Sequence, residues 1–346
     1  MGKERAAGGS VTLSDVAARA GVSLATASRA LNGSERVVRP ELKDRVLAAA
    51  GELGYTANQQ AQAVARGATR TVGVVLGDIA DPYFAAVAAG VTDAAGERGL
   101  VVTMASVGVD VDRIVDSLAV LRGGRPLAVL MAVSRHTDGS AEDRMTAELD
   151  RVHAYGGAVA FLGDAPDGFV AVPVAHRANA GALAGQLLEL GYRDAAVLTG
   201  PGELLTAAER AIGFLAAMER AGCPVPVERR LAGALSREGG FDAMTRLLAT
   251  GARPELVFAV TDVMAVGAMA AIRTAGLEPG RDIAVAGYDD IEMLQDVLPG
   301  LTTVSLPLRD IGRRLVDVAL GDDTAGANEP VRGTVVLRDS TPPKRD

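Results

Sequence analysis

T-L-S-D-V-A-A-R-A-G-V-S-L-A-T-A-S-R-A-L-N, at residues 12–32, is the stretch around which the rest of the chain is organised. Its pattern predicts two short helices joined by a tight turn. Ser14 is placed to cap the first helix, Gly21 to end it in a left-handed conformation, and Ser23 to cap the second helix. Ala27, in the second helix, is small enough to let the two helices pack closely together.

The open side of the second helix carries short side chains and one arginine. These residues are Leu24, Ala25, Thr26, Ser28 and Arg29. Such a helix fits the major groove of DNA, where an arginine can bind guanine O6 and N7 with two hydrogen bonds. An ordinary helical hairpin at a domain edge shares the same spacing, so the pattern alone leaves both interpretations open. A third helix, opened by Pro40, would complete a small three-helix DNA-binding unit.

The charge of the chain is divided unevenly. The 346 residues carry a formal net charge of -8, but residues 1–70 hold ten Lys and Arg against six Asp and Glu, a balance of +4, which leaves -12 on the rest. This division places the surface that attracts phosphate at the N-terminus. Cys223 is the single cysteine, which excludes an internal disulfide and a Cys-based metal site. The N-terminus lacks an apolar signal core and no run reaches membrane-spanning length, so we expect a cytoplasmic protein with no membrane partner.

From residue 71 onward, predicted strands and helices alternate. Continuous apolar runs such as T-V-G-V-V-L, at 71–76, predict strands of a parallel sheet covered on both faces. So many alternating elements predict an α/β body of two doubly wound sheets, with a ligand cleft at the carboxyl ends of the strands. Before this body, N-Q-Q-A-Q-A-V-A-R-G at 58–67 is too short for a stable isolated helix. That segment is either a linker or a helix that forms only against a partner.

Candidate ligand-binding residues lie at the predicted strand ends. Asp81, Tyr83 and Phe84 follow the first strand, and the two rings could form a stacking wall or cap the core of the lobe. Arg210 could reach a ligand or be an exposed helical arginine. Asp289 is one of two adjacent aspartates at the end of a later strand, and by itself is weak evidence for acid–base chemistry.

Enzyme signatures are missing from the sequence. There is no G-x-G-x-x-G nucleotide loop, no Walker P-loop and no G-x-S-x-G elbow. The three histidines, His136, His153 and His176, lack metal-ligand spacing and are expected to face solvent or to be capped locally. We therefore expect no catalytic residue, no metal site and no cofactor, and a doubly wound enzyme is the disfavoured alternative.

Taken together, these motifs resemble the LacI/GalR family of transcriptional regulators over nearly the whole chain. Residues 12–32 follow the family pattern D-V-A-x-x-A-G-V-S-x-x-T-V-S-R-x-L-N, and E-L-G-Y, R-T-V-G-V-V, D-P-Y-F, V-A-G-Y-D-D and L-T-T-V also match. The resemblance implies a helix-turn-helix regulator, expected to be a repressor, that binds near-palindromic operator DNA as a homodimer. A sugar-like or other small-molecule effector in the cleft would alter its DNA affinity. A periplasmic-type sugar-binding protein fits poorly, because it would carry a signal peptide and no helix-turn-helix.

The resemblance also gives the expected domains and the roles of single residues. The domains are 10–57, the helix-turn-helix; 58–71, hinge helix and linker; 72–172 with about 301–327, the N-lobe; and 173–300 with about 328–340, the C-lobe. The positions that match DNA contacts are Thr12, Ser23, Leu24, Ala25, Thr26, Ser28, Arg29, Asn32, Tyr55, Asn58, Ala61 and Val64. The positions that match effector contacts are Asp81, Tyr83, Phe84, Arg210 and Asp289.

The segment at 58–67 matches the hinge helix of the family, which folds only on operator DNA and lies in the minor groove. The resemblance thus favours a hinge helix over a plain linker. Val64 matches the residue that wedges into the central base step, and opening that step costs a few kcal/mol.

The cleft departs from the family pattern at three places. Gly163-Asp164 stands where relatives have Asp-Arg, and Thr261-Asp262 stands where they have Asn-Asp. V-A-H, at 174–176, stands where they have V-D-N. Sugar hydroxyls that lose their hydrogen-bond partners are costly to bury. These changes predict an effector that is not an ordinary hexose, or a weakened effector response.

Overall fold

The structure, a computed structural model, describes residues 11–32, 38–55, 69–322 and 329–344. The chain divides into two compact units, Met1–Thr69 and Arg70–Asp346. Among the described helices, none has the length and apolar character that crossing a membrane requires.

The first unit contains the three predicted helices, α1 (Leu13–Ala20), α2 (Leu24–Asn32) and α3 (Pro40–Leu53). Their shared core is formed by small and β-branched side chains, among them Val16, Ala20, Ala27, Val46 and Ala49. Gly21 has φ 63°, the left-handed conformation predicted for the turn. The prediction that Ser14 caps α1 is wrong: the cap is Thr12, which forms a capping box with Asp15.

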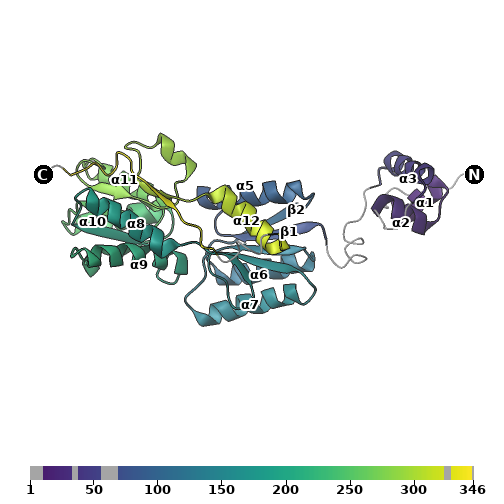
Figure 1. The fold of residues 1–346 in the computed structure, drawn as a ribbon, viewed down its shortest axis with the longest axis horizontal. Coiled ribbons are helices and arrows are strands. Elements are labelled where there is room, and N and C mark those ends of the chain that lie inside the picture. The colour runs from purple at the N-terminus through teal and green to yellow at the C-terminus, as the bar shows by residue number, and fades with distance from the viewer. Residues whose placement is uncertain (1–10, 33–37, 56–68, 323–328, 345–346) are drawn as a thin grey trace, which may run out of the picture. The chain divides into compact units, whose positions relative to one another are not determined.

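The second unit has two lobes, as the alternating pattern predicted. The N-lobe sheet is parallel in the order β2-β1-β3-β4-β5. Its strands are β1 (Thr71–Leu76), β2 (Val101–Ser106), β3 (Ala128–Ala132), β4 (Ala158–Leu162) and β5 (Val170–Val172). The helices that cover it are α5 (Pro82–Glu97), α6 (Val111–Gly123), α7 (Gly139–His153) and α12 (Leu308–Leu320). Helices α5 and α12 cover one face of this sheet, and α6 and α7 cover the other (Figure 1).

The C-lobe repeats this scheme with a parallel sheet in the order β7-β6-β8-β9. Its strands are β6 (Ala195–Thr199), β7 (Arg230–Ala232), β8 (Leu256–Ala259) and β9 (Ala284–Ala286). Its helices are α8 (His176–Glu189), α9 (Leu205–Arg220), α10 (Arg237–Ala249) and α11 (Asp262–Thr274). Helix α8 packs on α9, and α10 packs on α11. A 3-10 turn, Val227–Arg229, leads directly into β7.

Three crossovers join the lobes. The chain first passes from β5 to α8, returns through β10 (Thr303–Ser305) to α12, and crosses again to β11 (Thr334–Val336). Strands β10 and β11 pair antiparallel. Because α12 returns to the N-lobe from far along the sequence, it lies beside α5 (Figure 1).

Helices α5 and α12 approach each other backbone to backbone. A Cβ on Gly90 would lie 2.0 Å from the carbonyl oxygen of Arg309, and one on Gly312 would lie 2.1 Å from that of Val87. Neither clash can be relieved by turning a side chain. Glycine is therefore required at this contact by packing.

Gly90→Ala is expected to lower the free energy of unfolding by about 1–3 kcal/mol, because the two helices must move apart. Gly96→Ala, in the same helix, meets no atom within 4 Å and is expected to raise stability by about 0.5–1 kcal/mol. Denaturant unfolding of both variants measures the difference. Equal effects of the two substitutions would contradict the close contact.

Candidate functional site

The exposed face of α2 is the candidate site of the first unit. Leu24 is 54% exposed, and Ala25 and Arg29 are also exposed, whereas Thr26 and Ser28 are half-buried. Arg29 makes no hydrogen bond or ion pair with any residue that the structure describes. This helix therefore presents an apolar side chain and a free guanidinium, the two groups that contact thymine methyls and guanine edges in a major groove.

Two of the residues predicted to contact DNA also cap the N-termini of helices. The Thr12 hydroxyl accepts from the Asp15 amide at 3.3 Å, and the Ser23 hydroxyl accepts from the Thr26 amide at 3.1 Å. Tyr55 is half-buried against the three-helix core. The remaining predicted contacts, namely the side chain of Asn32, and Asn58, Ala61 and Val64 of the hinge segment, lie outside the described residues.

A cavity of about 120 Å³ lies between the lobes of the second unit, at the carboxyl ends of their strands. The structure brings together here all five residues that were predicted to bind an effector: Asp81, Tyr83, Phe84, Arg210 and Asp289. Position follows from topology, because the carboxyl ends of parallel strands are where doubly wound folds bind ligands.

Arg210 and Asp289 form a buried ion pair in the wall of this cavity. Arg210 Nη2 lies 2.8 Å from Asp289 Oδ1, and the two side chains are 3% and 4% exposed. Arg210 Nη1 donates to Asp289 Oδ2 at 3.1 Å and to the Val260 carbonyl at 2.9 Å. Burial raises the pKa of Asp289, and the Arg210 charge opposes that rise. The arginine is thus neither an exposed helical residue nor a freely available donor.

Two aromatic rings form another part of the wall. Tyr83 and Phe84 pack edge to face with centroids 5.0 Å apart, at the start of α5. Asp81 caps that helix by accepting from the Tyr83 amide at 3.0 Å. Both rings contact the lobe core and also line the cavity. They therefore cap the core of the lobe and form part of the cavity wall at the same time. Burial raises the pKa of the Tyr83 hydroxyl and of Asp81.

His176 lines the cavity but was not among the predicted effector contacts, because the sequence marked it only as a departure from the family pattern. We expected it to face solvent or to be capped locally, but its side chain is buried in the wall of the cavity. Its Nδ1 lies 3.3 Å from the Tyr288 hydroxyl and 3.4 Å from Arg210 Nε. Burial lowers the pKa of His176 well below its ordinary value, and the charge of Arg210 adds to this effect. The available signal was the departure V-A-H from the family pattern.

Asp262 is a second missed residue. Its carboxylate accepts from the Thr303 hydroxyl at 2.7 Å and from the Ile291 amide at 3.0 Å. It thereby holds the segment that follows Asp289 and the strand that bridges to Asp289 at Ser305. The backbone of Asp289 has an unusual φ of 119°. Burial raises the pKa of Asp262 from 3.8 to about 6. Asp262 thus positions the ion pair without belonging to it.

Among the residues that the structure describes, no group of three His, Cys, Asp or Glu side chains could hold a metal ion. The cavity wall therefore offers aromatic contacts, a neutral histidine and an ion pair, which suit recognition of a small organic molecule.

Comparison with known proteins finds family matches in both units of the chain. Residues 12–58 match the family of bacterial regulatory proteins named lacI, and residues 184–341 match a periplasmic binding protein-like domain. The chain is 33% identical to the ribose operon repressor of Escherichia coli strain K12 over 312 residues, which cover 89% of this chain and 92% of that protein. It is 32% identical to the transcriptional repressor PurR of Proteus mirabilis over 310 residues, 89% of each chain.

A solved structure of the Lac repressor dimer, bound to operator and the anti-inducer ONPF, is also similar. Its TM-score is 0.81 at 27% identity, and the match covers 96% of this chain and 100% of the Lac repressor chain. The similarity thus extends over the helix-turn-helix unit and both lobes of the body. The chain belongs to the LacI family and is a DNA-binding transcriptional regulator.

Proposed function

We propose that this regulator represses transcription by binding a near-palindromic operator as a homodimer, and that a small molecule in the cavity between the lobes changes its affinity for DNA. The observation that carries the proposal is the exposed face of α2, with Arg29 unpaired among the described residues. The similar Lac repressor structure contains a dimer, an operator and a small ligand, which supports the same assembly here. Such a repressor acts in the cytoplasm and catalyses no reaction.

Within the DNA-binding surface, Leu24, Ala25 and Arg29 would read base edges, and the hydroxyls of α2 and its cap would lie near bases or phosphates. Residues 58–67 would form the hinge helix, with Val64 entering the minor groove. Because Arg29 is the one long polar side chain on the exposed face of α2, apolar contacts and the ease of bending the site would supply much of the specificity.

Within the body, the effector would occupy the cavity of about 120 Å³. Tyr83 and Phe84 would pack against it, and Asp81 would bind one of its polar groups. The domain boundaries would follow the expected division, with α12 returned to the N-lobe.

Arg29→Ala is expected to weaken binding to the selected operator by about 1–3 kcal/mol and to relax the preference at one base pair of each half-site. Selecting bound sequences from random DNA, for the wild-type chain and the variant, measures both quantities. Two related half-sites are expected in the wild-type selection, and a single unpaired half-site would contradict the dimer.

Arg19→Ala is the matched control, because Arg19 is exposed on α1 and pairs with Glu52 at 2.6 Å. It is expected to leave the selected sequence unchanged. If Arg29→Ala weakened binding to operator and to random DNA equally, Arg29 would be a phosphate contact and not a base reader.

A further inference from the structure

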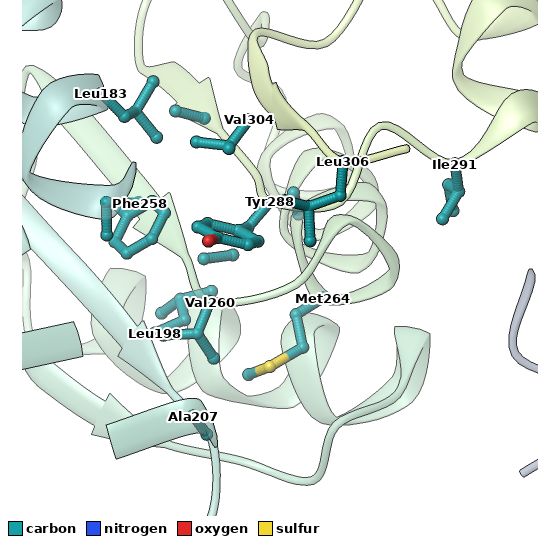
Figure 2. Close-up of a cluster of buried hydrophobic side chains, with 14 of the residues drawn as sticks. Leu183, Leu198, Ala207, Phe258, Val260, Met264, Tyr288, Ile291, Val304 and Leu306 are labelled. Carbon is teal, nitrogen blue, oxygen red and sulfur yellow. The ribbon is translucent and has the colours of Figure 1, made fainter. Parts of the chain in front are cut away.

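A chain of buried hydrogen bonds leads from the cavity to the third crossover between the lobes. The Gly333 amide donates to Asn179 Oδ1 at 3.1 Å, and Asn179 Nδ2 donates to the Tyr288 hydroxyl at 3.2 Å. That hydroxyl lies 3.3 Å from His176 Nδ1. Tyr288 is 0% exposed and packs among apolar side chains such as Phe258 and Val260 (Figure 2), so its hydroxyl depends on these two polar neighbours.

The direction of each hydrogen bond fixes the tautomer of His176. Since Asn179 donates to the Tyr288 oxygen, the hydroxyl proton of Tyr288 is available to His176 Nδ1. Arg210 Nε can only donate, and it also faces Nδ1, at 3.4 Å. With two donors directed at Nδ1, this atom must be an acceptor. The ring proton therefore resides on Nε2, and the imidazole is uncharged.

His176 Nε2 is the atom that this network leaves available. It has no hydrogen-bond partner among the described residues, and it is not one of the buried polar atoms sealed from solvent. His176 lines the cavity between the lobes. The network thus leaves one fixed N–H donor open on a residue that lines the cavity.

The charges around the cavity decide which molecules suit this donor. Arg210 is the one cationic side chain among the described residues that line it, and Asp289 neutralises its charge at 2.8 Å. Asp78 and Asp81 also line the cavity. An anionic ligand would have to give up water next to carboxylates, without an unpaired cation in return. An uncharged ligand with a hydrogen-bond acceptor meets no such cost.

The same network touches all three crossovers. His176 and Asn179 lie at the start of α8, directly after the first crossover. Tyr288 lies just before the second crossover, and Gly333 lies in the third, just before β11. A ligand bound to His176 would therefore be linked, through these hydrogen bonds, to the segments about which the two lobes are joined.

From these contacts we infer that His176 is a specificity-determining residue of the effector site: its fixed Nε2–H donates to an uncharged effector, and the cavity excludes phosphorylated ligands. This inference rests on the proposed effector function. It predicts the tautomer and protonation of the His176 imidazole in the chain without ligand. It also predicts tighter binding of uncharged ligands than of their phosphates, and the two predictions can be measured separately.

The state of the ring can be read by imidazole ¹⁵N NMR on the full-length chain, with His136→Gln and His153→Gln used to assign the three signals. We expect the proton on Nε2 of His176 and a ring pKa well below that of an ordinary histidine. Tyr288→Phe removes one of the two donors to Nδ1, so it is expected to shift the Nδ1 signal while Arg210 keeps the ring proton on Nε2. Tyr192→Phe is the control, because the Tyr192 hydroxyl donates to the Pro342 carbonyl at 2.7 Å, outside this network. A proton on Nδ1, or titration near the ordinary histidine pKa of about 6.5, would overturn the inference.

The ligand preference can be read by calorimetry with two matched pairs, D-ribose with D-ribose 5-phosphate and adenosine with adenosine 5′-phosphate. We expect an uncharged member to bind at least tenfold more tightly than its phosphate. His176→Ala should weaken that binding about threefold to tenfold, the value of one uncharged hydrogen bond, and His176→Asn should restore part of it.

Equal or tighter binding of the phosphates, or an unchanged affinity in His176→Ala, would overturn the inference while leaving the effector function intact. The proposed effector function itself would be contradicted if neither these probes nor an uncharged metabolite fraction changed the affinity of the wild-type chain for operator DNA. The NMR experiment needs no ligand, so it tests the tautomer of His176 independently of the effector function.

Discussion

Arg210→Met is expected to lower the free energy of unfolding by about 3–5 kcal/mol, because it leaves the Asp289 carboxylate buried without its partner. Asp289 is 3% exposed, and the Arg210 guanidinium also stacks 4.0 Å from the centre of the Tyr288 ring. Methionine keeps much of the volume of the side chain, so the loss reports on the charge more than on a cavity. Denaturant unfolding at neutral pH measures it.

Arg177→Met is the matched control from the neighbouring helix. Arg177 pairs with Glu209 at 2.6 Å, but its side chain is 59% exposed, so its removal is expected to cost less than about 1 kcal/mol. The double variant Arg210→Met with Asp289→Asn should regain most of the lost stability, because no buried charge remains and asparagine tolerates the positive φ of this position. If Arg210→Met lowered the free energy of unfolding by as little as Arg177→Met does, the buried ion pair would not be needed for stability.

Asp262→Asn is expected to change how stability depends on pH. Burial raises the pKa of Asp262 from 3.8 to about 6 in the folded chain, so the folded state holds this proton more tightly than the unfolded state does. The stabilisation is complete below the unfolded pKa and is lost as the pH rises through the folded value. Relative to the Asn variant, the wild-type free energy of unfolding should fall by about 3 kcal/mol between about pH 4 and pH 7.

Asp282→Asn provides the control for this measurement. The Glu278 amide and Arg281 hold the pKa of Asp282 below 3.8, so the difference between wild type and this variant should stay flat over the same pH window. Denaturant unfolding at several pH values gives both curves. A flat curve for Asp262→Asn as well would contradict a buried carboxyl with a raised pKa.

The first unit was largely predictable from the sequence, because its structure depends on local signals. Gly21 ends α1, Ser23 caps α2 and Pro40 opens α3, all as predicted. The one misplaced cap shows the limit of such signals. Thr12 and Ser14 are both good capping residues, and the capping box with Asp15 favours Thr12.

The cleft was predictable only in part. The strand-end rule and the family resemblance placed Arg210 and Asp289 in it, but neither indicated that the two side chains pair with each other. His176 carried no local signal for its buried position, since a histidine at a helix start is commonly exposed. Its environment comes from Tyr288, which lies 112 residues further along the chain.

By itself, the sequence determined the elements, their order and the class of protein, because capping and hydrophobic periodicity act over a few residues. Only the tertiary structure decided what the cleft offers to a ligand. Arg210 and Asp289 are 79 residues apart, and they meet because parallel strands bring their carboxyl ends to one edge of a sheet. Once buried there, each polar group must find a partner. Those partners neutralise the charge of Arg210 and fix the proton position of His176.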